Sequence, residues 1–88
     1  SEKTNADYSV VMVTAKNKYG QIFVVEYARD HMTPQQTIDK VFEFINRYGK
    51  SAKVGIESVA YQKAMIYILK DEMKRRGVYF TVEAIASI

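Results

Sequence analysis

Four short apolar runs and two longer helical stretches alternate along the chain. Residues 8–15 (YSVVMVTA) and 21–28 (QIFVVEYA) are rich in β-branched and aromatic side chains, which predicts two strands joined by a turn over 16–20. Gly20 suits this turn because glycine adopts a positive φ without strain. Both runs are apolar without interruption at their centres, so we expect both faces of these strands to be buried.

Two amphipathic helices follow the hairpin. The first, over 34–48, begins with Thr33 as its N-cap and Gln36 to complete a capping box. The second, over 59–76, follows Ser58, a further capping residue. Each helix has one apolar stripe that predicts its core-facing side. The stripes consist of Ile38, Val41, Phe42 and Ile45 in the first helix, and Tyr61, Ala64, Met65, Ile68 and Leu69 in the second.

Short strands over 53–57 and 78–82 complete the order β-β-α-β-α-β. This order predicts an α/β fold with a mixed sheet, in which one antiparallel pair is followed by parallel strands added through helical crossovers. A chain of 88 residues is too short for two hydrophobic cores, so we expect a single domain over 1–88. Residues 1–7 are polar and are expected to form a loop.

Composition excludes several classes of protein. The chain has no cysteine, which excludes a disulfide scaffold and a thiolate zinc site. No apolar run approaches the roughly 20 residues that a membrane-spanning helix needs. The net charge of +3 permits a polyanionic partner without requiring one. Cations that could contact phosphates gather at the end of the second predicted helix, where they also complement the helix dipole. They are Lys70, Lys74, Arg75 and Arg76.

Glu57 is the ionisable residue that the predicted topology singles out. Ligands of open α/β sheets bind beyond the carboxyl ends of the parallel strands, and Glu57 ends the strand over 53–57, directly before a helix. Two interpretations remain open for Glu57, a ligand-binding carboxylate or a solvated strand end. His31, in the loop before the first helix, is expected to be solvated rather than to act as an acid or base.

Three blocks of sequence resemble the C-terminal nuclease domain of phage terminase large subunits, which has a ribonuclease H-like fold. They are DYSVV at 7–11, EY at 26–27 leading into Thr33-Pro34, and VGIE at 54–57 followed by AYQKA at 60–64. The resemblance covers the whole chain, which corresponds to the middle of that domain. It implies an endonuclease that cuts concatemeric viral DNA during genome packaging in the cytoplasm of the bacterial host, with acidic side chains that hold two Mg²⁺ or Mn²⁺ ions.

By this resemblance, Glu57 matches the family's second acidic metal ligand, and Asp7 matches the aspartate of its Asp-Tyr pair. The family's first catalytic aspartate would precede Ser1, its later ligands would follow Ile88, and its ATPase domain is not part of this chain. We therefore expect the chain alone to be inactive or nearly so and to bind little metal. The partners implied are double-stranded DNA, the portal protein and the small terminase subunit.

The resemblance also predicts how the sheet is built. The family's first strand lies at the centre of its sheet, between the hairpin and the strand over 53–57. Without it, either these two flanks pair directly or another copy of the chain fills the gap through the unpaired edges. Two alternatives remain for function: a non-catalytic α/β interaction module from a prophage, and part of another ribonuclease H-like nuclease such as a junction resolvase or a transposase.

Overall fold

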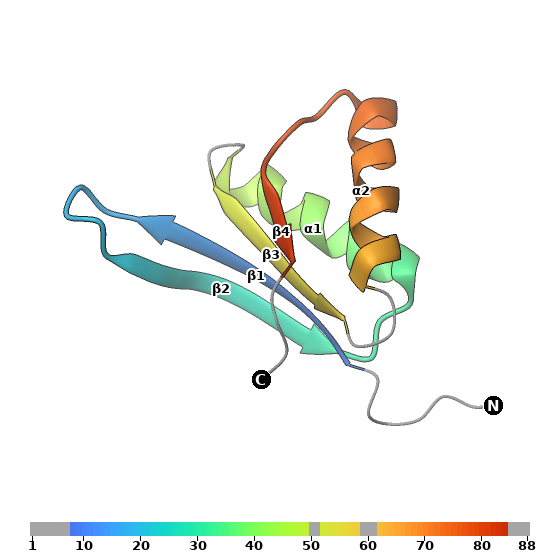
Figure 1. Cartoon of the computed structure of the whole chain (residues 1–88), viewed down its shortest axis with the longest axis horizontal. Coiled ribbons are helices and arrows are strands. Elements are labelled where there is room, and N and C mark those ends of the chain that lie inside the picture. The colour runs from blue at the N-terminus through green and yellow to red at the C-terminus, as the bar shows by residue number, and fades with distance from the viewer. Residues whose placement is uncertain (1–7, 50–51, 59–61, 85–88) are drawn as a thin grey trace.

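A computed structural model describes residues 8–49, 52–58 and 62–84 of the chain. A four-stranded sheet and two helices form two layers, and the β-hairpin projects beyond the helices along the longest dimension of 47 Å (Figure 1). The elements follow the predicted order. They are β1 (Ser9–Lys16), β2 (Ile22–Asp30), α1 (Pro34–Tyr48), β3 (Lys53–Ser58), α2 (Gln62–Arg76) and β4 (Val82–Ala84).

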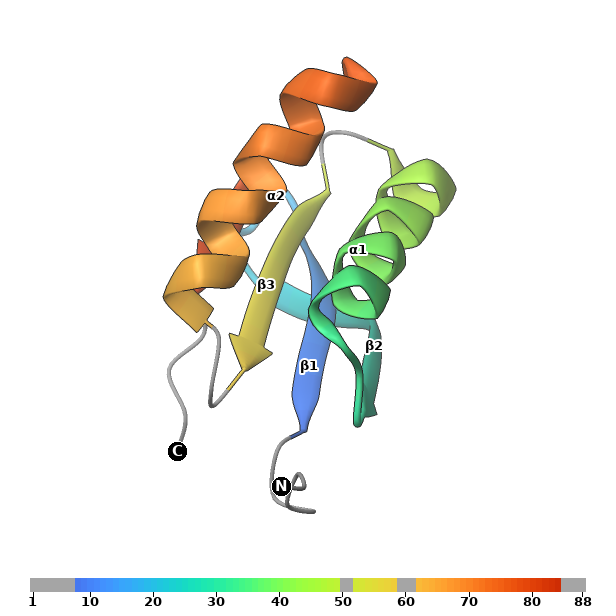
Figure 2. The same cartoon turned by 90° about the vertical axis from the view of Figure 1, so that its right-hand side faces the viewer.

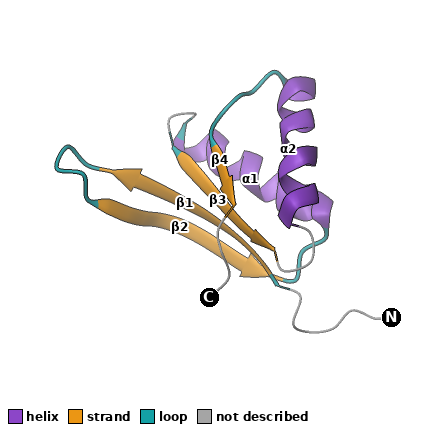
Figure 3. Ribbon diagram, in the orientation of Figure 1, coloured by secondary structure: helices purple, strands orange, loops and turns teal. Residues whose placement is uncertain are grey.

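The strands lie in the order β2-β1-β3-β4 (Figure 3). β1 pairs directly with β3, from Ser9 opposite Ser58 to Thr14 opposite Lys53, which is the first of the two arrangements that we expected for the flanks. The expectation that every strand after the hairpin is added in parallel is wrong, because β3 is antiparallel to β1 and parallel to β4 alone. β3 runs in the direction of β2 but lies on the far side of β1, so its direct neighbour must be antiparallel.

Both helices cover the same face of the sheet (Figure 2). Side chains of a strand point alternately to its two faces, and the register shows which of them face the helices. Val11 and Val13 of β1 and Val54 and Ile56 of β3 face the helices, and each is at most 1% exposed. They pack with the apolar stripes of α1 and α2 into one hydrophobic core.

The expected burial of both hairpin strands on both faces is wrong. Ile22, Val24 and Tyr27 of β2 are each more than half exposed. β2 is an edge strand, its amino-terminal half extends past the helices, and no described element covers the other face of the sheet. The uninterrupted apolar run of β2 therefore predicted a strand correctly, but it did not indicate how many faces of the sheet are covered at that strand.

α1 begins and ends as its sequence predicts. The Thr33 hydroxyl accepts a hydrogen bond from the backbone N–H of Gln36 (3.1 Å), and the Gln36 side chain accepts one from the backbone N–H of Thr33 (2.9 Å). Gly49 ends the helix with a φ of 92°, a conformation that favours glycine. The four predicted core-facing residues of α1 are buried, together with Thr37 and Phe44.

The apolar face of α2 is narrower than predicted. Of the expected core-facing residues, Met65 and Leu69 are buried, Ala64 and Ile68 are exposed, and Tyr61 lies outside the described residues. Met73, which lies outside the predicted apolar stripe, is 6% exposed and continues the line of Met65 and Leu69 one turn further along the helix. The buried residues of α2 therefore form one i, i+4, i+8 row, and the partly buried Ile66 packs against the core beside it.

The last strand begins later than predicted. Residues 78–81 form a connection rather than a strand, and β4 is Val82–Ala84. Val78 and Phe80 pack against the core from this connection, and the Phe80 ring meets Phe42 edge to face at 5.3 Å. The alternating apolar residues of 78–81 therefore belong to a connection that packs against the core after α2 and before the pairing of β4 with β3 begins. Among the described residues, no helix combines the length and the apolarity that crossing a membrane requires.

Candidate functional site on the open face of the sheet

The face of the sheet opposite the helices, which we call the open face, carries the candidate site. Because directly opposed residues of paired strands point to the same face, the register defines two neighbouring rows across it. One row consists of Arg29, Val10 and Glu57, and the other of Tyr27, Met12, Gly55 and Glu83. The centre of this face is apolar and its charged groups stand toward the sides.

Glu57 occupies the position that the strand-end rule selects. It is the penultimate residue of β3, its side chain lies on the open face opposite Val10, and it is half-buried. β3 and β4 form the parallel pair of the sheet, so Glu57 stands at the carboxyl end of a parallel strand. The predicted position of this carboxylate near the end of a parallel strand is therefore confirmed, whereas the predicted start of a helix directly after it falls on residues outside the described ones. The chemical role of Glu57 stays a prediction.

Arg29 and Tyr8 form a stacked pair at the same end of the open face. The central carbon of the Arg29 guanidinium lies 3.9 Å from the centre of the Tyr8 ring. The ring of His31 also stacks on Tyr8, with 4.0 Å between ring centres and 27° between the ring planes. His31 is exposed, as predicted, but it contacts an aromatic ring rather than solvent alone.

The described residues do not by themselves form a metal centre. Carboxylate oxygens are the ligands that Mg²⁺ and Mn²⁺ prefer, and Glu57 offers one such group. Within 8–49, 52–58 and 62–84, however, no three histidine, aspartate or glutamate side chains converge as a metal-binding group. Asp7, the weaker of the two predicted ligands, lies outside the described residues. A two-metal site would therefore need ligands beyond those described.

The predicted phosphate-contacting cations lie on α2, away from the open face. Lys70 and Lys74 are exposed, whereas Arg75 and Arg76 both bind the Glu72 carboxylate, at 2.7 and 2.8 Å. The Glu72 carboxylate therefore neutralises part of the positive charge of these two arginines. Hydrogen bonds from Arg75 and Arg76 in turn hold the pKa of Glu72 below its ordinary value. The structure thus does not bring the basic cluster and Glu57 together.

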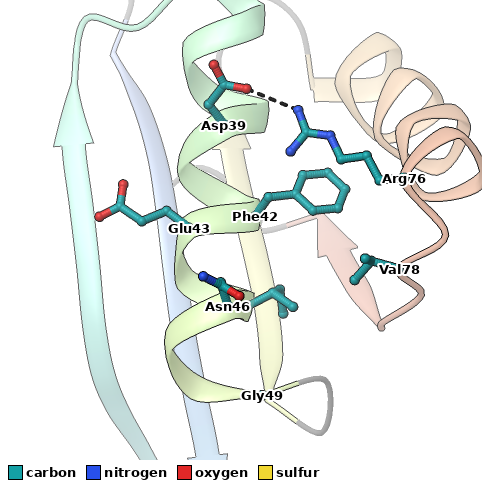
Figure 4. A pocket seen from close by; sticks show the side chains of 8 residues that line it. Asp39, Phe42, Glu43, Asn46, Gly49, Arg76 and Val78 are labelled. Atoms are coloured by element: carbon teal, nitrogen blue, oxygen red, sulfur yellow. Dashed lines mark hydrogen bonds and ion pairs between the residues drawn. The ribbon is translucent and has the colours of Figure 1, made fainter.

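A shallow groove of about 730 Å³ opens between α1 and the segment that follows α2 (Figure 4). Asp39, Phe42 and Asn46 line it from α1, and Arg76 and Val78 line it from the other side. The Arg76 side chain crosses the groove and reaches Asp39 at 3.2 Å. The groove lies on the helix side of the sheet, so it belongs to the packing of the two helices rather than to the surface that carries Glu57.

Sequence reasoning selected Glu57 but missed Arg29 and Tyr8. Their sequence positions do not reveal that they meet, because 20 residues and a hairpin turn separate them. The alternation of side chains along β2 could have placed Arg29 and Tyr27 on one face of the sheet. The expectation that both faces are buried left no reason to distinguish an exposed face from a covered one.

No family model, curated protein or solved structure matches the chain.

Proposed function

We propose that this chain forms part of a metal-dependent DNA endonuclease of the terminase type, in which Glu57 supplies one metal-binding carboxylate. The observation that carries this proposal is the position of Glu57 on an open face at the carboxyl end of a parallel strand. This is where open α/β sheets bind ligands. The β-β-α-β-α-β order and the VGIE block that ends with Glu57 support the same proposal.

In the complete site, further acidic side chains from outside the described residues would join Glu57. The two Mg²⁺ or Mn²⁺ ions that they hold would supply an activated water and stabilise the leaving oxygen of the cleaved phosphodiester. The contribution of this chain would be to fix one carboxylate on a rigid strand. Ile56, directly before Glu57, is fully buried and holds that end of β3 against the helices.

Concatemeric viral double-stranded DNA is the proposed substrate, and the portal protein and the small terminase subunit are the proposed partners. Such an enzyme acts in the cytoplasm of the bacterial host. We expect the 88-residue chain to show no cleavage on its own, because one carboxylate cannot hold two divalent cations against water.

The test uses a protein that continues this chain at both ends through its native flanking sequence. In that protein we expect Mn²⁺-dependent nicking of plasmid DNA, and we expect Glu57→Gln to abolish it. Glu83→Gln is the matched control, because Glu83 stands on the same face in the neighbouring row and pairs with Lys53 at 3.4 Å. The proposal is wrong if Glu57→Gln cuts DNA as fast as the unaltered protein does.

A second candidate is a non-catalytic module that binds nucleic acid through α2. Lys70 and Lys74 favour it, because both are exposed and neither has an ion-pair partner among the described residues. The exposed ring of Tyr67 lies beside them on the helix surface. Binding that depends on Lys70 and Lys74, falls steeply with salt and ignores Mn²⁺ would favour this candidate over the nuclease.

A further inference from the structure

Arg29 and Glu57 flank the same residue, Val10, on the open face of the sheet. Both oppose Val10, Arg29 across the β1–β2 pair and Glu57 across the β1–β3 pair, so all three side chains point to the open face. Two strand spacings place the Cα atoms of Arg29 and Glu57 about 10 Å apart. One extended ligand lying across β1 could therefore reach both side chains.

Arg29 differs from the other three arginines of the chain. Arg47, Arg75 and Arg76 each bind carboxylates at 2.7–3.2 Å. Within the part of the chain that the structure describes, no carboxylate pairs with Arg29, although its side chain is exposed and ordered against a ring. Among the residues that the structure describes, its positive charge is therefore positioned by a ring and not neutralised by a carboxylate.

The contact with Tyr8 leaves the hydrogen-bond donors of Arg29 accessible. A guanidinium that stacks on a ring uses its flat face, whereas its N–H groups point outward in its own plane. The stacking also reduces the number of side-chain conformations, so a ligand would order the side chain at a smaller entropic cost. A planar fork of N–H donors matches the oxygens of a phosphate group, and the hydrogen bonds it forms are charge-assisted.

We propose that Arg29, held by Tyr8, contacts a phosphate of DNA on the open face, so that the DNA backbone lies across β1 between Arg29 and Glu57. This inference rests on the proposed function, since it names the path of the substrate beside the same carboxylate. Arg29 is the phosphate-binding residue, and Tyr8 is a positioning residue that acts through it. The half-buried Val10 and Met12 form the apolar floor beneath this path.

The test measures binding of a fluorescent 20-base-pair duplex to the 88-residue chain by anisotropy, in EDTA and at several salt concentrations. We expect Arg29→Gln to weaken binding about tenfold, because it removes a charge-assisted phosphate contact. We also expect the slope of log K against log salt to become shallower by about 1. Arg29→Lys should keep that slope and lose part of the affinity, because it retains the charge without the fork.

Further variants distinguish the positioning role of Tyr8 from a general effect of positive charge and from a loss of the folded structure. Tyr8→Phe keeps the ring and should bind as the unaltered chain does, whereas Tyr8→Ala removes the ring and should weaken binding with the salt slope retained. Lys18→Gln is the matched control, since it removes one exposed positive charge at the hairpin turn, at the opposite end of β2 from Arg29. Circular dichroism of each variant establishes that its fold is intact.

The outcome distinguishes this inference from the proposed function. Unaltered binding by Arg29→Gln, an equal loss for Lys18→Gln, or no measurable binding by the unaltered chain at low salt would each overturn the phosphate contact. Because EDTA removes divalent cations, these results do not depend on Glu57 as a metal ligand. A DNA path through Arg29 together with normal cleavage by Glu57→Gln would overturn only the proposed role of Glu57 as a metal ligand.

Discussion

The guanidinium of Arg76 lies over the ring of Phe42, with its central carbon 4.1 Å from the ring centre. The same guanidinium binds Glu72 of its own helix at 2.8 Å and Asp39 of α1 at 3.2 Å. Arg75 also binds Glu72, but it is more exposed and reaches no residue of α1 in the described structure. Arg76 therefore joins the two helices, whereas Arg75 does not.

We expect Arg76→Ala to destabilise the fold more than Arg75→Ala does. Loss of the contact with Phe42 and of the packing of the arginine stem should lower the free energy of unfolding by about 1 kcal/mol. In a domain of this size, that change lowers the midpoint of thermal unfolding by about 4–8 °C. Thermal unfolding of both variants followed by circular dichroism tests this expectation, and equal midpoints would contradict it.

Glu26 of β2 accepts hydrogen bonds that join the helix layer to the sheet. The Tyr48 hydroxyl donates a hydrogen bond to its carboxylate at 2.5 Å, and Arg47 binds the same oxygen at 2.7 Å. Both residues belong to α1, so this group attaches the helix to β2. The hydrogen bonds from Tyr48 and then Arg47 lower the pKa of Glu26 from its ordinary value of 4.5, while the pKa of Tyr48 is raised above 10.0.

The direction of the shift in the pKa of Glu26 predicts how stability depends on pH. A carboxyl whose pKa falls on folding stabilises the fold above pH 4.5, and the stabilisation is lost as pH falls through the folded-state pKa. Tyr48→Phe should therefore raise the pKa of Glu26 and reduce stability at pH 7, and the deficit should vanish in acid. NMR titration of the Glu26 carboxyl measures the shift directly. Tyr19→Phe, at the hairpin turn, is the control, and an unchanged Glu26 pKa in Tyr48→Phe would contradict the prediction.

The two isoleucines Ile38 and Ile22 should respond differently to the same substitution. Ile38 of α1 is 1% exposed, and Ile38→Ala should cost about 2–5 kcal/mol because it removes buried surface and leaves a cavity. Ile22 of β2 is 67% exposed, and Ile22→Ala should cost less than about 1 kcal/mol, mostly through lower strand propensity. Urea unfolding measures both. A similar cost at the two positions would mean that β2 is covered in solution.

The candidate site was partly predictable. Glu57 follows from two local features, a short apolar strand and a helix directly after it, and the strand-end rule needs no knowledge of register. Arg29 and Tyr8 could not be found in this way, because their contact depends on how β1 pairs with β2. A shift of one residue in that pairing would move Arg29 to the other face of the sheet.

The sequence by itself determined the number and order of the elements and the limits of α1, because capping boxes, glycine stops and helical periodicity act between residues close in the chain. Tertiary structure decided the direct pairing of β1 with β3, the exposure of β2 and the inward direction of Met73. These features depend on which neighbour each strand or helix meets. A strand has the same backbone conformation whether one or both of its faces are covered. Its own residues therefore do not determine which faces are exposed to water.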